Sequence, residues 1–147
     1  MKYSRALFLF AFLFLFLTPC FAHHMAVVVN KDNNVGELTS AHLSGIFRLE
    51  VKKWRDGKDV VLVLHKNSSG EMLTLQRLSK MSASELKSFI AAHQESITTV
   101  DTDDDVLKLV GSIPGAIGLV EVHTITDQVN VVKVDGKLPM EAGYLPH

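Results

Sequence analysis

The chain has 147 residues, with 15 Lys or Arg against 16 Asp or Glu, and its 47% apolar and 21% charged residues are ordinary values for a folded protein. This composition excludes an intrinsically disordered chain, and the even charge balance excludes a nucleic-acid binder with a strongly basic face. The apolar residues are unevenly spread, because six of the eight phenylalanines lie in the first 22 residues. The leader and the remainder are therefore two different kinds of segment.

The leader has the pattern of a secretory signal peptide. Lys2 and Arg5 give a positive start, residues 6–17 are apolar, and small residues around Ala22 form a cleavage site. Twelve apolar residues are fewer than the roughly 18 to 20 that a membrane-spanning helix needs. We therefore expect a periplasmic or secreted protein with a signal peptide over residues 1–22.

Cleavage after Ala22 would leave residues 23–147 as a single domain of 125 residues. Its formal net charge is −3, because 13 basic and 16 acidic residues remain. Cys20 is the one cysteine of the chain, so the cleaved domain has no disulfide. The leucine three residues before Cys20 leaves lipidation of that cysteine as an alternative.

The cleaved domain is predicted to begin with a strand and a helix. The β-branched run at residues 25–30 predicts a buried strand, and the polar residues 31–34 form the turn behind it. Thr39 or Ser40 can cap the helix that follows. Its apolar residues fall at helical spacing and are Leu43, Ile46 and Phe47.

An Asp-Gly turn at residues 55–58 leads into residues 60–64, the strongest strand signal in the chain. This run is apolar on both faces, as expected of a strand in the middle of a sheet that helices cover. Three helices are predicted after it. The first carries apolar residues at positions 72, 73, 75 and 78, the second opens with the capping box Ser82–Glu85, and the third has an acidic start at Asp101–Asp105.

Two further short strands are predicted at residues 116–120 and 129–134. Pro114 and Gly115 end the preceding helix, and Asp135-Gly136 forms a turn after the last strand. The alternation of strands and helices predicts an α/β fold with a central mixed or mostly parallel sheet flanked by helices.

The junction between strand and helix at residues 65–71 is the main candidate for a functional site. A helix that begins directly after an inner strand points unpaired backbone N–H groups outward at the carboxyl edge of the sheet, where anions bind. Hydroxyls, a glycine that allows close approach and a lysine suit such a site. The candidates are Ser69 and Gly70, followed by Ser68, Asn67 and Lys66. The same residues can also form a helix N-cap that binds no ligand.

Several segments carry a family resemblance in a shared order. Leu38–Phe47 followed by Trp54–Gly57, the serine-glycine junction, Gly115–Val120 and Val131–Gly136 resemble successive motifs of the substrate-binding proteins of phosphate ABC transporters. The resemblance implies one lobe of a type II periplasmic-binding-protein-like fold. It also implies a non-enzymatic protein without a cofactor that binds phosphate or a similar inorganic oxyanion, with an ABC transporter membrane component or an envelope protein as partner.

The junction departs from the pattern R-x-x-x-S-G-T of that family at two positions. His65 stands in place of an arginine that would pair bidentately with phosphate, so it would bind the ligand only when protonated or hydrogen-bonded to it. That role predicts tighter binding at acidic pH. Glu71 stands in place of a threonine and would repel an anion unless it turns away or accepts the ligand's proton.

The resemblance covers one lobe of a two-lobe clamp, so weak binding is expected unless a partner or a second copy closes the cleft. A homodimer with facing lobes is one such arrangement. The alternative function is an envelope adaptor or sensor module that has kept the lobe and lost the ligand.

The remaining polar residues predict neither a metal site nor an enzyme. The seven histidines lack metal-ligand spacing, and Asp101–Asp105 lacks the glycine and the later glutamate of a calcium loop. Ser69, His65 and Asp103 could suggest a hydrolase triad, but the Gly-x-Ser-x-Gly turn around the nucleophile is absent.

Overall fold

A computed structural model describes residues 24–146 of the chain. The predicted signal peptide and Cys20 lie outside the described residues. In chain order the elements are β1 Met25–Asn30, β2 Glu37–Leu38, α2 Ser40–Phe47, β3 Val61–His65, α3 Ser69–Ser79, α4 Ala83–Ala92, β4 Ile97–Val100, α5 Asp103–Ser112, β5 Ala116–Glu121, the 3₁₀ helix η1 Val122–Thr124, β6 Val129–Val131 and β7 Lys133–Val134.

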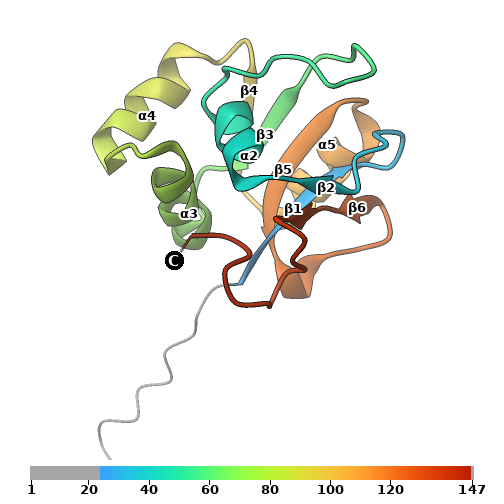
Figure 1. Ribbon diagram of the computed structural model, residues 1–147. Coiled ribbons are helices and arrows are strands. Elements are labelled where there is room, and N and C mark those ends of the chain that lie inside the picture. Colours follow the sequence, from blue (N-terminus) through green and yellow to red (C-terminus); the bar gives the residue numbers. More distant parts are fainter. Residues whose placement is uncertain (1–23, 147) are drawn as a thin grey trace, which may run out of the picture.

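A five-stranded sheet of order β4-β3-β5-β1-β6 runs through the middle of the domain (Figure 1). β3 pairs in parallel with β4 and β5, whereas β1 pairs antiparallel with β5 and β6. Four strands of this sheet therefore share a direction and β1 opposes them, which confirms the predicted mixed, mostly parallel sheet. Because β3, β4 and β5 are parallel, their carboxyl ends meet at one edge, which we call the carboxyl edge.

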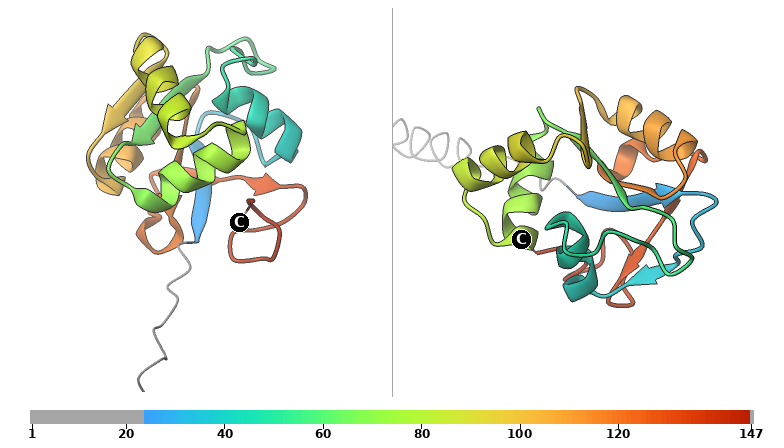
Figure 2. Two further views of the ribbon diagram at one scale, coloured as in Figure 1. Left: turned by 90° about the vertical axis from the view of Figure 1, so that its left-hand side faces the viewer. Right: turned by 90° about the horizontal axis from the view of Figure 1, so that it is seen from above.

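Helices cover both faces of the sheet (Figure 2). α5 packs on one face against β5, β1 and β3, over a core that includes Val28, Val63 and Val106. α2, α3 and the carboxy-terminal segment cover the other face, where the larger core includes Leu43 and Leu75. α4 packs against α3. None of the described helices has the length and apolar character needed to span a membrane.

The buried side chain of Tyr144 connects the carboxy-terminal segment to the sheet through hydrogen bonds. Its hydroxyl donates to the carbonyl oxygen of Val132 at 2.6 Å and accepts the N–H of Val27 at 3.1 Å. Burial raises the pKa of Tyr144 to about 12, so the hydroxyl keeps its proton at physiological pH. One side chain thus joins the chain end to β1 and to the residue after β6.

Most predicted elements are present, with Thr39 as the cap of α2 and a complete capping box at Ser82 and Glu85. The predicted strand 129–134 is wrong as a single strand, because it divides at Val132 into β6 and β7. Val132 is buried and donates its N–H to Val27, after which β7 pairs with β2 in a separate two-stranded sheet. Leu73 is 45% exposed and does not belong to the buried face of α3.

β2 and β4 were not predicted from the sequence. β4 carries two exposed threonines and lies at the edge of the sheet next to β3, so it has no continuous apolar run to reveal it. This omission matters for the site, since β4 brings the start of α5 to the carboxyl edge.

Candidate functional site

The amino terminus of α3 lies directly after β3 at the carboxyl edge. Ser68 is its N-cap: the side chain is largely buried and its hydroxyl accepts the N–H of Glu71 at 3.2 Å. The amides of Ser69 and Gly70 precede the first hydrogen-bonded turn and have no acceptor in the described part of the chain. The junction therefore forms a cap through Ser68 and also presents two open backbone donors.

The other two polar candidates of the junction, Lys66 and Asn67, are exposed and both contact Asp101. The Nζ of Lys66 is 3.2 Å from Oδ1 of Asp101, and Nδ2 of Asn67 donates to the same oxygen at 3.1 Å. Exposed pairs of this kind are weak. Both side chains are thus beside the junction and can be released from Asp101 at little cost.

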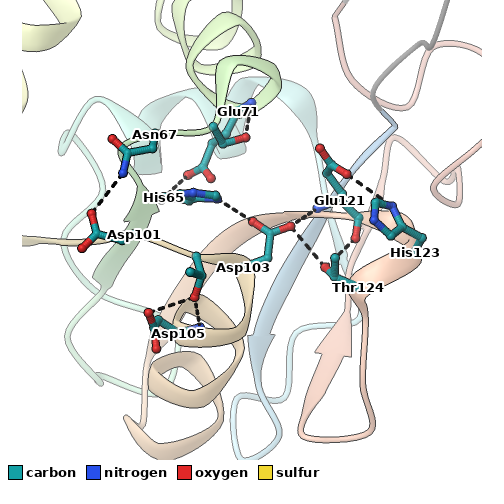
Figure 3. A network of polar contacts seen from close by, with 11 residues as sticks. His65, Asn67, Glu71, Asp101, Asp103, Asp105, Glu121, His123 and Thr124 are labelled. Carbon is teal, nitrogen blue, oxygen red and sulfur yellow. Dashed lines mark hydrogen bonds and ion pairs between the residues drawn. The ribbon is translucent and has the colours of Figure 1, made fainter.

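Glu71 is turned into the protein (Figure 3). It is completely buried, and its Oε1 accepts the backbone N–H of His65 at 3.1 Å. Its Oε2 has no hydrogen-bond partner in the described structure. Burial raises the pKa of Glu71 well above its ordinary value, and the nearby carboxylate of Asp103 adds to the rise against the lowering effect of the His65 N–H. The glutamate therefore leaves the outer end of α3 clear, one of the two arrangements in which it does not repel an anion.

His65 is held by Asp103 from the start of α5 (Figure 3). Its Nδ1 is 2.8 Å from Oδ1 of Asp103, and the side chains are only 17% and 12% exposed. The other oxygen of Asp103 accepts the N–H of Glu121 at 2.9 Å and the hydroxyl of Thr124 at 3.2 Å. Asp103 thus ties β3, α5 and the end of β5 together.

The structure separates the junction into two groups of residues. Ser68, Ser69 and Gly70 form the outer start of α3, whereas His65 and Glu71 point inward toward Asp103. Ser69 makes no described hydrogen bond with His65 or Asp103.

The inward cluster of His65, Glu71 and Asp103 was missed as a unit by sequence reasoning. One signal was present, because His65 is the last residue of β3 and Asp103 follows β4, and polar residues at the ends of adjacent parallel strands meet at one edge. Asp103 could be placed beside His65 only if β4 was recognised as a strand next to β3, and β4 was not predicted from the sequence.

Glu71→Gln is expected to raise the thermal midpoint at neutral pH. As pH rises past the ordinary glutamate pKa, the unfolded chain releases a proton that the buried Glu71 of the folded chain retains, so the parent loses stability and the variant does not. Each unit of pKa difference is worth about 1.4 kcal/mol. Melting curves in chelator-treated buffer should show a gain that is largest at pH 7.5 and vanishes near pH 4.

Glu85→Gln provides a control of opposite sign. The pKa of exposed Glu85 is lowered by its hydrogen bonds to Ser82, so its replacement should lower the thermal midpoint at neutral pH and have less effect in acid. If Glu71→Gln also melted below the parent at pH 7.5, the buried carboxylate would have to be ionised and stabilised in the fold.

Two sequence comparisons relate the chain to known proteins. The family model described as PBP superfamily domain matches residues 16–145. The phosphate-binding protein PstS of Bacillus subtilis (strain 168) is 30% identical over 120 residues. The match covers 78% of this chain and 37% of the Bacillus protein, so the chain spans well under half of that relative.

Solved structures with the same fold agree with the sequence match. An ABC-type phosphate transport receptor from Vibrio cholerae superposes with a TM-score of 0.63 at 19% identity, over 79% of this chain and 48% of that one. A substrate-binding protein from Clostridium perfringens, solved with bound phosphate, gives 0.61 at 26% identity, over 77% and 45%. The names of these proteins describe binding proteins and a receptor, in agreement with the prediction that the chain is not an enzyme.

Proposed function

The chain belongs to the PBP superfamily, and on that premise we propose that it is a non-enzymatic binding protein for phosphate or a similar inorganic oxyanion. The ligand binds at the amino terminus of α3, with Ser69 and Gly70 as the main contacts. Ser68, Asn67 and Lys66 lie next to it, and His65 contributes from the inner side.

One observation carries this proposal: the amides of Ser69 and Gly70 have no acceptor in the described structure and stand at the start of an 11-residue helix. Such amides bind an oxyanion directly, and the helix dipole favours negative charge there. The hydroxyl of Ser69 is exposed beside them and can donate a further hydrogen bond.

The charges around the junction are compatible with an anion. Glu71 is buried inside the fold and turned away from the outer end of the helix, and burial raises its pKa well above its ordinary value, which disfavours its charged form. Lys66 is exposed and pairs weakly with Asp101. Lys66 can therefore exchange its ion pair with Asp101 for an ion pair with a bound oxyanion.

The affinity of the isolated chain is proposed to be weak. The chain spans 37% of the Bacillus relative and 45% to 48% of the two solved structures. A ligand at an open helix end keeps much of its surface in water, which limits the binding free energy. We propose that a second copy, an envelope protein or an ABC transporter membrane component covers the ligand after export of the chain to the periplasm or the exterior.

The test is the thermal midpoint of the purified, tag-free protein with and without phosphate, at fixed ionic strength and with chloride as the comparison anion. A site filled at 100 times its Kd adds about 2.7 kcal/mol, which is several degrees for a domain of this size. Phosphate should raise the midpoint and chloride should not.

Gly70→Asp should abolish the phosphate-dependent rise, because it places a carboxylate against the ligand. Aspartate is favourable in the first turn of a helix, so the variant should fold. Gly36→Asp is the matched control, since Gly36 lies in an exposed loop with open space around it and gains the same charge. A parent protein that shows no response to phosphate would contradict the proposal and favour the adaptor or sensor function.

A further inference from the structure

Three side chains from three elements meet at the carboxyl edge (Figure 3). They are His65 at the end of β3, Glu71 in the first turn of α3 and Asp103 at the start of α5. Each offers one atom able to ligate a metal, and the three atoms lie within 4.8 Å of one another. Imidazole nitrogen and carboxylate oxygen are ligands of Zn²⁺ and related divalent ions. We propose that His65, Glu71 and Asp103 form a binding site for a divalent transition-metal ion, with Zn²⁺ as the best match.

An independent observation on Glu71 points to a ligand. Its side chain is completely buried, and its Oε2 has no partner in the described structure. A buried polar atom without a partner is costly and rare in folded proteins. Because Glu71 belongs to the cluster, a cation between the three side chains would give this oxygen the partner that it lacks.

The distances in the cluster suit an ion of this size. Nδ1 of His65 and Oδ1 of Asp103 are 2.8 Å apart. A Zn²⁺ ion binds nitrogen and oxygen ligands at about 2.0 to 2.2 Å, so it can contact both atoms once the hydrogen between them is lost. Around a tetrahedral ion these bond lengths place any two ligand atoms roughly 3.3 to 3.6 Å apart, so small movements of the side chains complete the site.

The surroundings hold the ligands in place and leave a route to solvent. The second oxygen of Asp103 accepts the N–H of Glu121 and the hydroxyl of Thr124, which orients the carboxylate in the way that outer-shell partners orient metal ligands. The side chains of His65 and Asp103 keep 17% and 12% exposure, so the ion can enter from the carboxyl edge. Three protein ligands leave coordination positions for water.

The metal site goes beyond the proposed oxyanion site, with which it shares only His65. The ion uses inward-facing side chains, whereas the oxyanion uses the outward amides of Ser69 and Gly70. A metal titration in phosphate-free buffer therefore fails or succeeds independently of the phosphate experiment.

The experiment is calorimetric titration of Zn²⁺ into the purified, tag-free, chelator-stripped protein, together with the visible absorption of a Co²⁺-loaded sample. One equivalent of Zn²⁺ should bind, and Co²⁺ should give the absorption of an ion with mixed nitrogen and oxygen ligands. Glu71→Gln keeps the shape of the side chain and should weaken Zn²⁺ binding at least tenfold. Glu95→Gln, an exposed substitution of the same type, should bind like the parent.

Two further results decide the outcome. His123→Gln should leave the titration unchanged, which separates the cluster from the His123–Glu121 pair on the surface. Equal Zn²⁺ affinity in Glu71→Gln and Glu95→Gln, or absence of Zn²⁺ binding by the parent, would overturn the proposal. The cluster would then be a structural hydrogen-bond network without a bound ion.

Discussion

Asp103→Ala is expected to lower the free energy of unfolding by about 3 kcal/mol, because it removes one acceptor that serves three donors. The carboxylate bonds His65, the N–H of Glu121 and the hydroxyl of Thr124, at distances of 2.8 to 3.2 Å. These partners are partly buried and come from different elements, so water cannot fully replace the lost acceptor. Denaturant unfolding in chelator-treated buffer measures the change.

Asp104→Ala is the matched control for this substitution. Asp104 is the next residue in the first turn of α5, is exposed and makes no described hydrogen bond. Its removal loses only a favourable interaction with the helix dipole, worth about 0.3 to 1 kcal/mol. A loss in Asp103→Ala no larger than in Asp104→Ala would show that the Asp103 contacts do not hold the carboxyl edge together.

Gly115→Ala is expected to destabilise the fold by roughly 3 to 5 kcal/mol, from backbone strain together with overpacking. Gly115 has φ +82°, and a Cβ placed there would lie 2.1 Å from the carbonyl oxygen of Asp59. The carbonyl of Gly115 also accepts the indole N–H of Trp54 at 2.8 Å and the N–H of Val61 at 3.1 Å. The backbone therefore cannot move away without breaking the contact between β5 and the segment before β3.

Gly57→Ala separates the two causes. Gly57 has φ +88° but would have nothing within 4 Å of its Cβ, so alanine there costs only the left-handed conformation, about 1 to 2 kcal/mol. Equilibrium unfolding of both variants isolates the collision as the difference between them. Equal losses would mean that the Asp59 carbonyl yields without cost.

The close contact at Gly115 explains why the Gly115–Val120 motif begins with a glycine. Gly118, three residues later in β5, is also constrained, since a Cβ would lie 2.8 Å from Val106 and 2.9 Å from the carbonyl oxygen of Val63. The two glycines let α5 and the segment around Asp59 approach β5 closely. They serve packing, whereas the glycine at the start of α3 serves the proposed ligand.

The sequence by itself determined the local elements and the type of fold. The apolar run at β3, the β-branched run at β1 and the capping box of α4 each form as predicted, because their signals lie within a few neighbouring residues. The order of strands and helices was enough to predict a mixed, mostly parallel sheet covered by helices. The junction before α3 was also identified, and of the residues expected to be able to form its N-cap the structure uses Ser68.

Only the tertiary structure decided where His65 and Glu71 point. Asp103 lies 38 residues from His65, and they meet because β4 pairs in parallel with β3 and delivers the start of α5 to the same edge. The inward turn of Glu71 depends on the N–H of His65 and on the core around it, neither of which leaves a local pattern. Sequence periodicity reports which residues are buried in one element, whereas a polar cluster built from three elements depends on the pairing of strands far apart in the chain.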